Sequence, residues 1–423
     1  MRILFANNFF GPFGGAENVM WDEANLLQRQ GHDVHFFATD RKPYFIPNYE
    51  NAHFFPAYAD FRNVSTWDKL KRMSRIFYNR EAEERLTGYL RYLKPDLVHV
   101  HNLHYHLSPS ILAACQREAV PVVMTLHDIR MICPSASLTE SADFRGLCNT
   151  GNPLICMKKK CKNGSLSETL VSVAEYYANR RHSLYQSVRM FITPSAALLE
   201  LVSRFGIPRA QLMHINNFID PQLVKQAATC AEDSREQGYF LYVGRLSREK
   251  GVQYLLQAMR RLPDVHLKIA GSGPYEAELK ALALALNLQN VEFLGFKDKV
   301  SVSTLLAECR ATVLPCNWFE NLPLSVIESL AFAKPVIASR VGGLPEILDQ
   351  GRCGLLVEPG NVEQLADALA DLTRNPQKAR TLGLAGQVRA REVYSEERHL
   401  EQLLALYGRL VSQSATKRQL QPC

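Results

Sequence analysis

Residues 312–328 read Thr-Val-Leu-Pro-Cys-Asn-Trp-Phe-Glu-Asn-Leu-Pro-Leu-Ser-Val-Ile-Glu, and this stretch indicates the fold of its half of the chain. The apolar run Thr312–Leu314 predicts a short buried strand that ends at the following proline. Pro323 suits the first turn of a helix, because its missing N–H would lack a partner there in any case. The helix is predicted over Leu324–Phe332, and another apolar strand follows at Val336–Ala338. Strand, loop and helix in this order are typical of a parallel sheet.

The same alternation extends outward along the chain in both directions. Helical patterns separate short apolar runs, which predict strands at Arg2–Ala6, Asp33–Ala38, Leu97–His101, Val120–Thr125, Met190–Thr193, Tyr239–Val243, His266–Ala270 and Val291–Phe293. Such repetition predicts parallel sheets with helices on both faces and right-handed crossovers. The predicted fold class is therefore α/β, with two doubly wound, Rossmann-like halves.

The pattern also predicts domain boundaries. Residues 1–221 form the expected N-terminal domain, which carries a cysteine-bearing insert at 131–164 that interrupts the alternation. The polar, charged stretch 222–238 has no strong period and is the candidate linker. Residues 239–394 form the second domain. Residues 395–423 are predicted to be a C-terminal helix and tail that packs back on the N-terminal domain.

Composition narrows the class of protein further. The chain has 423 residues, 47% hydrophobic and 22% charged, which excludes a disordered, collagen-like or coiled-coil protein. Its 49 Lys and Arg against 42 Asp and Glu give a net charge of +7, which favours anionic partners such as phosphates, nucleotides or a membrane surface. No nucleic-acid-binding motif is present, so no nucleic-acid partner is expected. Without a run of roughly 18 apolar residues or a signal-peptide pattern, we expect a cytoplasmic location.

Candidate functional residues follow several predicted strands, because ligands of open α/β sheets bind beyond the carboxyl ends of the strands. In the first half, Gly14 and Gly15 follow the first strand and open a helix, where free N–H groups favour an anion. A tight turn without a ligand is the alternative. His127 follows another strand and can hydrogen-bond a sugar hydroxyl or a developing charge, although a lone histidine is more often structural.

In the second half, Gly244, Arg245 and Lys250 lie on one loop after a strand. The two cations can clamp a diphosphate, Arg as a fork and Lys as a point charge. The alternative is a solvated run of charges. Further on, Glu320 lies on a loop and Glu328 on a helix, where a carboxylate can accept two adjacent ribose hydroxyls. A favourable charge at a helix start, or a glycosidase carboxylate pair, is the alternative there.

Together these residues resemble the group-4 family of retaining glycosyltransferases, which have the GT-B fold. The resemblance covers nearly the whole chain. It rests on the order of the motifs along the chain as well as on the residues within each motif. It is carried by Gly14-Gly15-Ala-Glu17, Pro95-Asp96-Leu-Val-His99-Val-His101-Asn102, His127-Asp128, the G-R-L-x-x-x-K-G loop Gly244–Gly251, the E-x7-E pair Glu320 and Glu328, and the block Pro335–Ile347. One turn departs from the family pattern, because Phe218 follows Asn217 where the family has glycine.

The resemblance implies that two domains face each other across a cleft and that the donor is a nucleotide-diphosphate sugar. It implies retention of anomeric configuration and no required metal or cofactor. Arg245 and Lys250 would hold the diphosphate, and Glu328 would bind the ribose. His127 would contact the donor sugar near the reacting carbon. Glu320 would hold that sugar together with the backbone of the adjoining stretch Asn321, Leu322, Pro323 and Leu324.

The remaining nucleotide-binding candidates are Gly14, Gly15, Asn217 and Gly244, with Gly15 offering its N–H to a phosphate. The expected acceptor is a hydroxyl of a saccharide or of a lipid-linked carrier, in the synthesis of surface polysaccharide or lipid-linked glycan. Two other functions stay open, namely a nucleotide-sugar epimerase of the UDP-GlcNAc type and a non-catalytic nucleotide-sugar binding module.

Three further features of the sequence are open to two interpretations. The segment Trp67–Arg80 has an apolar stripe beside basic residues, which suits either the inner face of an anionic membrane or an ordinary surface helix. The insert holds candidate ligands of a structural zinc ion, or else free thiols, at Cys133, Cys148, Cys156 and Cys161. A histidine cluster is interpreted as polar residues on the acceptor side before metal ligands, at His99, His101, His104 and His106.

Overall fold

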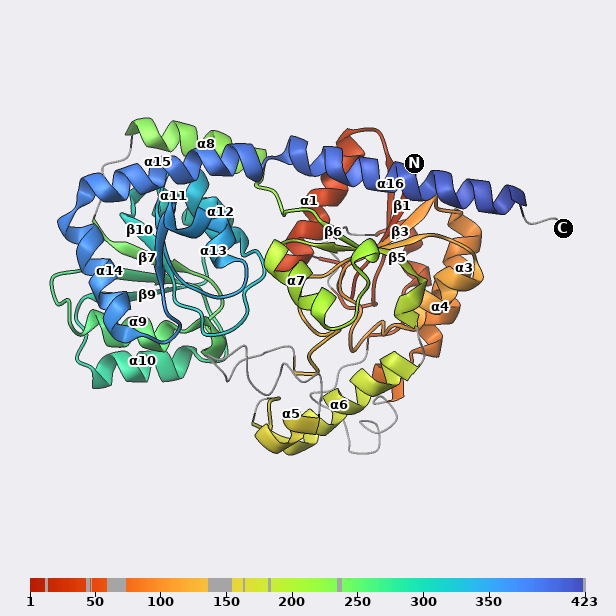
Figure 1. Ribbon diagram of the computed structural model, residues 1–423, viewed down its shortest axis with the longest axis horizontal. Coiled ribbons are helices and arrows are strands. Elements are labelled where there is room, and N and C mark those ends of the chain that lie inside the picture. Colours follow the sequence, from red (N-terminus) through yellow and green to blue (C-terminus); the bar gives the residue numbers. More distant parts are fainter. Residues whose placement is uncertain are drawn as a thin grey trace.

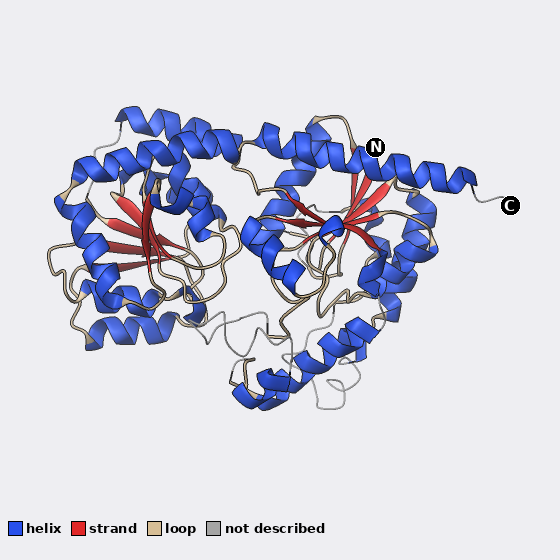
Figure 2. Ribbon diagram, viewed as in Figure 1, coloured by secondary structure: helices blue, strands red, loops and turns tan. Residues whose placement is uncertain are grey.

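The computed structural model describes residues 1–11, 14–42, 46, 48–58, 74–135, 154–162, 164–181, 184–233 and 238–420. It contains two six-stranded parallel sheets, one in each half of the chain, which lie side by side with helices around them (Figures 1 and 2). The predicted α/β class with two Rossmann-like domains is confirmed. The strands are β1 Arg2–Ala6, β2 Asp33–Phe37, β3 Leu97–Val100, β4 Val122–Thr125, β5 Val188–Thr193, β6 Leu212–His214, β7 Phe240–Val243, β8 Leu267–Ala270, β9 Val291–Gly295, β10 Ala311–Leu314, β11 Val336–Ser339 and β12 Gly354–Val357.

The order of the strands in each sheet indicates where a ligand would bind. The first sheet runs β2-β1-β3-β4-β5-β6, and the second runs β12-β11-β10-β7-β8-β9. The order therefore reverses between β1 and β3 in one sheet and between β7 and β10 in the other. Ligands of doubly wound sheets bind at such reversal points, outside the carboxyl ends of the strands. The loops after β1, β7 and β10 are the ones that carry the glycine, lysine and glutamate candidates.

Helices cover both faces of the sheets (Figure 2). The α-helices are α1 Gly15–Arg29, α3 Arg80–Leu93, α4 Ser110–Arg117, α5 Leu154–Lys159, α6 Leu166–Arg181, α7 Ala196–Arg204, α8 Pro221–Asp233, α9 Val252–Met259, α10 Glu276–Ala285, α11 Lys299–Glu308, α12 Leu324–Ala331, α13 Leu344–Ile347, α14 Val362–Arg374, α15 Pro376–Val393 and α16 Glu396–Leu420. Short 3-10 helices are η1 Glu50–Phe54, η3 Leu184–Ser187, η4 Arg209–Gln211, η5 Arg248–Lys250 and η6 Asp349–Gly351.

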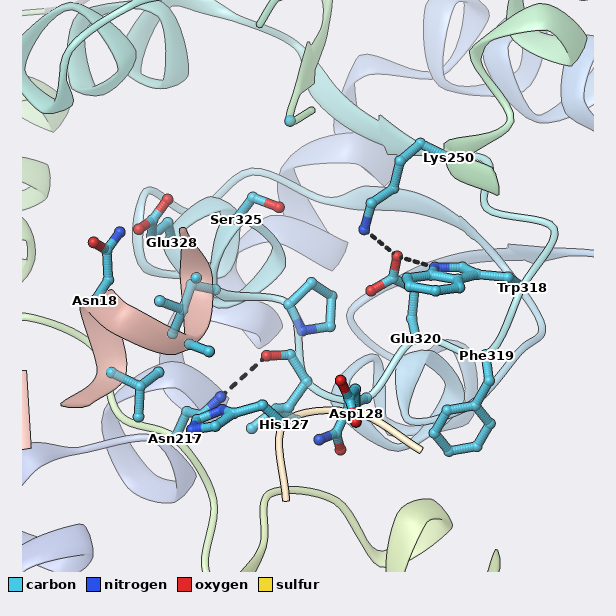
Figure 3. A pocket seen from close by; sticks show the side chains of 18 of the residues that line it. Asn18, His127, Asp128, Asn217, Lys250, Trp318, Phe319, Glu320, Ser325 and Glu328 are labelled. Atoms are coloured by element: carbon cyan, nitrogen blue, oxygen red, sulfur yellow. Dashed lines mark hydrogen bonds and ion pairs between the residues drawn. The ribbon is translucent and has the colours of Figure 1, made fainter. Parts of the chain in front are cut away.

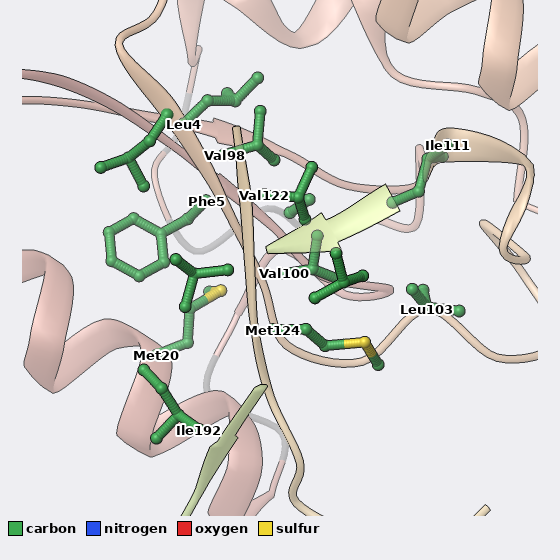
Figure 4. Close-up of a cluster of buried hydrophobic side chains, with 14 of the residues drawn as sticks. Leu4, Phe5, Met20, Val98, Val100, Leu103, Ile111, Val122, Met124 and Ile192 are labelled. Atoms are coloured by element: carbon green, nitrogen blue, oxygen red, sulfur yellow. The ribbon is translucent and has the colours of Figure 1, made fainter. Parts of the chain in front are cut away.

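The core of the first half lies between its sheet and the flanking helices (Figure 4). Phe5 of β1, Val98 of β3 and Val122 of β4 are almost completely buried. Burying each such side chain stabilises the fold by roughly 1.5–3 kcal/mol relative to leaving it exposed. Because the central strands are apolar on both faces, they carry the loops of the first half on a rigid sheet.

The stretch 222–238, predicted as a linker without a strong period, is a helix for most of its length. Helix α8 packs on the second half through Leu223 and Ala227, which belong to its hydrophobic core. The apolar residues of α8 recur at helical spacing, and this pattern outweighs the polar composition that suggested a linker. The insert also differs from the loop predicted for it, because it includes α5, which packs on α6.

Helix α16 returns to the first half after the second half is complete (Figure 1). Leu403, Leu406, Tyr407 and Leu410 are part of the N-terminal core. At its start, Glu396 pairs with Arg29 of α1. In the described part of the chain, no helix is both long enough and apolar enough to cross a bilayer.

Candidate active site

A cavity of about 430 Å³ lies between the two halves, at the carboxyl ends of their strands (Figure 3). Its volume is within the range typical of small-molecule sites. The first half contributes Gly15, Ala16, Asn18, Val19, His127, Asp128 and Ile129. The second half and its approach contribute Asn217, Val243, Gly244, Lys250, Trp318, Phe319, Glu320, Asn321, Leu322, Pro323, Leu324, Ser325 and Glu328.

An ion pair between the half-buried Lys250 and the buried Glu320 lies on one side of the cavity (Figure 3). The same Glu320 oxygen accepts a hydrogen bond of 2.7 Å from the indole N–H of Trp318. Burial alone would lower the pKa of Lys250, but the Glu320 carboxylate outweighs burial and raises the pKa above its usual value. Lys250 therefore stays charged, and its ammonium group is held in a fixed place beside the cavity.

Close contact between two loops sets the position of Lys250. The next residue, Gly251, has φ +74°, and a Cβ atom there would lie 1.8 Å from the carbonyl oxygen of Pro315. Only glycine allows this approach of the loop after β7 to the loop after β10. The lysine of one loop is thereby brought to the glutamate of the other.

A second glycine turn supports Glu320 from behind. The amide of Gly343 donates to the carbonyl oxygen of Glu320 at 2.8 Å. A Cβ atom on Gly342, which has φ +54°, would lie 1.8 Å from the same oxygen. The Gly-Gly turn before α13 thus fixes the backbone of the loop that ends at α12.

Glu328 lies on the opposite side of the cavity, on the second turn of α12, near Asn18 and Ser325 (Figure 3). Burial raises the pKa of this half-buried carboxyl group to about 7, and the neighbouring Asp22 and Asp220 add to the rise against Lys299. Two hydroxyl groups that donate to this carboxylate would stabilise its ionised form and so lower its pKa again.

Glu328→Gln is expected to stabilise the unliganded protein at high pH. In the unfolded chain the carboxyl group ionises near pH 4.5, and in the folded protein near pH 7, so ionisation opposes folding as pH rises through this window. Removing the charge should raise the free energy of unfolding by about 3 kcal/mol more at pH 8 than at pH 4.5. Urea unfolding at both pH values measures the difference. The exposed Glu363→Gln is the control, and equal effects for the two variants would contradict the assignment.

His127 belongs to the loop that follows β4, across the cavity from Lys250. Its Nε2 lies 2.8 Å from Nδ1 of His101. Burial lowers the pKa of His127 to about 3, and the neighbouring His101 adds to the effect. The imidazole is therefore neutral, which suits a hydrogen-bonding group beside a developing positive charge better than a cation does.

The two halves contact each other directly beside the cavity. The side chain of Asn321 donates to the carbonyl oxygen of Leu126 at 3.0 Å and accepts from Ser195 at 2.7 Å. Glu346 of α13 accepts from the amide of Ala196, at the start of α7, at 2.8 Å. These bonds set the distance between His127 on one half and the Glu320 loop on the other.

Most of the residues predicted from the sequence come together in this cavity. Arg245 does not, because its side chain is exposed and lies outside the described lining. Gly14 is the N-cap of α1 and only adjoins the lining residue Gly15. Sequence reasoning missed Asn18 and Trp318, although Asn18 lies one helical turn after Gly15 and Trp318 is two residues from Glu320.

Two of the four clustered histidines were misinterpreted as acceptor-side residues. His99 and His101 are 0% and 1% exposed and lie in the interior of the first half, because β3 is a central strand of its sheet. His104 instead contacts Glu175 at 3.4 Å. His106 lies against Tyr58, with ring centroids 4.8 Å apart.

The cysteine candidates are only partly within the described structure. Cys148 lies outside it, as do residues 67–73 of the basic amphipathic segment. Cys133 and Cys156 are buried, and Cys161 is partly exposed. Among the described residues, Glu23, His99 and His101 are the group of three whose potential ligand atoms lie within 4.8 Å of one another. The zinc site of the insert stays a prediction.

Two doubly wound halves with a cavity between them are the architecture of GT-B glycosyltransferases, and family models match both halves. The model of Glycosyltransferase Family 4 matches residues 13–223, and that of Glycosyl transferases group 1 matches residues 231–389. The chain therefore belongs to the group-4 family of GT-B glycosyltransferases.

Relatives and solved structures agree with this assignment. The chain is 23% identical over 419 residues to N-acetyl-alpha-D-glucosaminyl L-malate synthase of Bacillus anthracis, covering 96% of each chain. Sucrose-phosphate synthase of Thermosynechococcus elongatus has a TM-score of 0.74 at 21% identity, over 98% of this chain and 100% of that one. HepE of Anabaena, solved with UDP and glucose, has a TM-score of 0.66 at 20% identity, over 96% and 99%. At this identity the solved structures support the fold.

Proposed function

We propose that this glycosyltransferase moves a hexosyl group from a nucleotide-diphosphate sugar to a hydroxyl group of a saccharide or lipid-linked acceptor, with retention and without a metal ion. The observation that carries the proposal is the arrangement around one cavity of the Lys250–Glu320 pair, the first turn of α12 and Glu328. Lys250 is a cation, as a diphosphate needs. The first turn of α12 offers backbone N–H donors, as sugar oxygens need, and Glu328 accepts hydrogen bonds, as ribose hydroxyl groups need.

The leaving group is stabilised by positive charge. Breaking the glycosyl–phosphate bond develops negative charge on the departing diphosphate, and a preorganised cation lowers that barrier. Lys250 is half-buried and charged at the cavity, and the N-terminus of α12, which has no side-chain cap, presents backbone N–H groups and a positive dipole end. Arg245 is exposed on the same loop and would complete the clamp from the solvent side when the donor binds.

Glu328 is proposed to bind the ribose hydroxyls of the nucleotide. UDP is the nucleotide bound to HepE, which makes UDP-sugars the first donors to test. Glu320 and the stretch Asn321–Leu324 would then hold the donor sugar, with the neutral His127 on the opposite wall near the reacting carbon.

The acceptor is proposed to enter from the first half of the molecule, which faces the donor side across the cavity. Closure around both substrates would exclude water and favour transfer over hydrolysis. Surface polysaccharide or lipid-linked glycan synthesis is the proposed setting. Contact of residues 67–80 with an anionic membrane surface belongs to the same proposal, because a lipid-linked acceptor is presented there.

The proposal is tested by release of nucleoside diphosphate from a panel of UDP- and GDP-sugars. The reaction is run with and without a crude lipid acceptor fraction, and with EDTA. We expect one donor to give acceptor-stimulated release that resists EDTA and is lost in Glu328→Ala and Arg245→Ala. Arg248→Ala is the matched control, because Arg248 is an exposed arginine of the same loop.

The competing functions give different outcomes. An epimerase would convert the sugar of the donor without leaving nucleoside diphosphate. A binding module would bind the donor without turnover under any acceptor condition. NMR of the product anomer separates retention from inversion, and an inverted anomer would overturn the retaining mechanism while leaving the transferase in place.

A further inference from the structure

A buried carboxylate lies behind His127, on the side away from the cavity. Glu23 of α1 is 1% exposed, and three histidine nitrogens surround it. His101 Nε2 is 3.4 Å and His99 Nδ1 is 3.5 Å from its Oε2, and His399 Nε2 is 3.2 Å from its Oε1. His101 in turn contacts His127 at 2.8 Å. A continuous chain of side chains thus joins α16 to the cavity wall.

Glu23 is ionised, and α16 supplies one of its partners. Burial would raise the pKa of Glu23, but hydrogen bonds from His101 and His399 outweigh it and hold the pKa well below its usual value. Nδ1 of His399 lies 2.7 Å from the carbonyl oxygen of Asn216, and Nε2 faces the Glu23 carboxylate. Carbonyl and carboxylate oxygens only accept hydrogen bonds, so each ring nitrogen of His399 faces an acceptor.

The charge of Glu23 sets the direction of the hydrogen bonds that lead to the cavity. Nε2 of His101 lies 3.4 Å from a carboxylate oxygen, and a negative charge there favours hydrogen on this nitrogen. A neutral imidazole that carries hydrogen on Nε2 has its lone pair on Nδ1, so His101 accepts at Nδ1 from Nε2–H of His127. His127 then keeps the lone pair on its own Nδ1. One tautomer and one ring orientation follow.

We propose that Glu23 is a positioning residue that fixes the tautomer and orientation of His127 through His101, with His399 as its partner on α16. The proposal rests on the proposed function in giving His127 a part in glycosyl transfer. The positioning itself does not depend on any substrate. Two residues from opposite ends of the chain, Glu23 and His399, thereby prepare the same wall of the active site.

The alternative explanation for the cluster of Glu23, His99 and His101 is that it binds a metal ion. Ligands of a tetrahedral site lie about 3.4 Å apart when bonds are about 2.1 Å, which resembles the spacing around Glu23. The tyrosine hydroxyl of Tyr407, however, already contacts Nδ1 of His99 at 2.6 Å. A cation on Nε2 of His101 would also put the hydrogen on Nδ1 and reverse the bond to His127. The two accounts therefore predict opposite tautomers.

The test combines histidine-selective ¹⁵N NMR with kinetics on Glu23→Gln. In the wild-type chain, the ¹⁵N signals of His127, assigned by their loss in His127→Gln, should report hydrogen on Nε2. Glu23→Gln should shift these signals towards mixed tautomers and lower kcat at least about tenfold, with donor KM changed less than about twofold. The matched control is Glu83→Gln, which removes another buried carboxylate of the first half, paired with Arg117, and should change neither readout.

His101→Gln is the second variant, because it cuts the link to His127 and keeps the Glu23–His399 pair. It should give the same loss of a single His127 tautomer even if Glu23→Gln does not fold. Unchanged His127 signals in the folded variants would overturn the proposal. About one equivalent of metal in the purified wild-type protein, lost in Glu23→Gln, would also overturn it. The NMR measurement needs no turnover. It therefore tests the positioning of His127 even if the protein does not transfer a glycosyl group.

Discussion

Lys250→Ala is expected to lower kcat by about 100-fold or more, the largest effect of any single side chain in the proposed reaction. Lys250 is the half-buried cation that lines the cavity, and its ammonium group is already placed beside Glu320 before a donor arrives. Removing it takes away stabilisation of charge that develops only in the transition state. Single-turnover release of nucleoside diphosphate measures the effect on the chemical step.

Loss of folding has to be separated from loss of chemistry in this variant. Lys250→Ala leaves the Glu320 carboxylate, 6% exposed, without its cation, which costs about 3–5 kcal/mol of stability for a buried pair. Lys250→Arg keeps the charge, so it should fold normally and still lose rate through the altered shape of the cation. Lys280→Ala is the control, since Lys280 is half-exposed and pairs with Glu276 at 2.7 Å. A folded Lys250→Ala enzyme with normal kcat would refute the role.

Gly251→Ala is expected to lower the free energy of unfolding by about 2–4 kcal/mol, the largest effect of any single added methyl group considered for this fold. Two penalties combine at this position, a φ of +74° and a Cβ atom 1.8 Å from the carbonyl oxygen of Pro315. The neighbouring atom belongs to backbone and has no rotamer that would move it away. Urea unfolding measures the stability, and donor binding reports the displaced Lys250.

Gly31→Ala carries the first penalty alone, so the difference between the two variants measures the second. Gly31 has a φ of +80°, but a Cβ atom there would meet no described atom within 4 Å. Its loss should be about 1 kcal/mol, from backbone strain alone. Equal losses for Gly31→Ala and Gly251→Ala would mean that the loop after β7 yields easily, and the close approach would then not position Lys250.

The fold could be predicted where a strand is apolar enough to be buried on both faces. The run Thr312–Leu314 and the helix from Leu324 correspond to β10 and α12. The edge strands β6 and β12 were not predicted, because β6 has only three residues and ends in a histidine, and β12 begins with a glycine that reads as a turn. Polar composition also concealed α8, whose buried side faces only one other layer of helices.

The sequence allowed prediction of those site residues that lie just after the carboxyl ends of strands. Lys250, Glu320 and Glu328 were found because parallel strands bring their carboxyl ends to one edge of a sheet. Sequence reasoning did not find the contact of Glu23 with His399, since it depends on how α16 crosses α1. Arg245 lies on the expected loop, but the direction of an exposed side chain is set by solvent and ligand, not by the pattern.

The route of α16 has a consequence for how this protein is made. Domains usually fold in order as they leave the ribosome, the N-terminal one first. Here the N-terminal core includes Leu403, Leu406, Tyr407 and Leu410. The first domain to be synthesised therefore remains with a gap in its interior, and with Glu23 lacking its partner His399, until the second domain has been translated completely. A nascent chain stalled before residue 396 should expose that apolar groove to chaperones, so the first half of the molecule is the last to be finished.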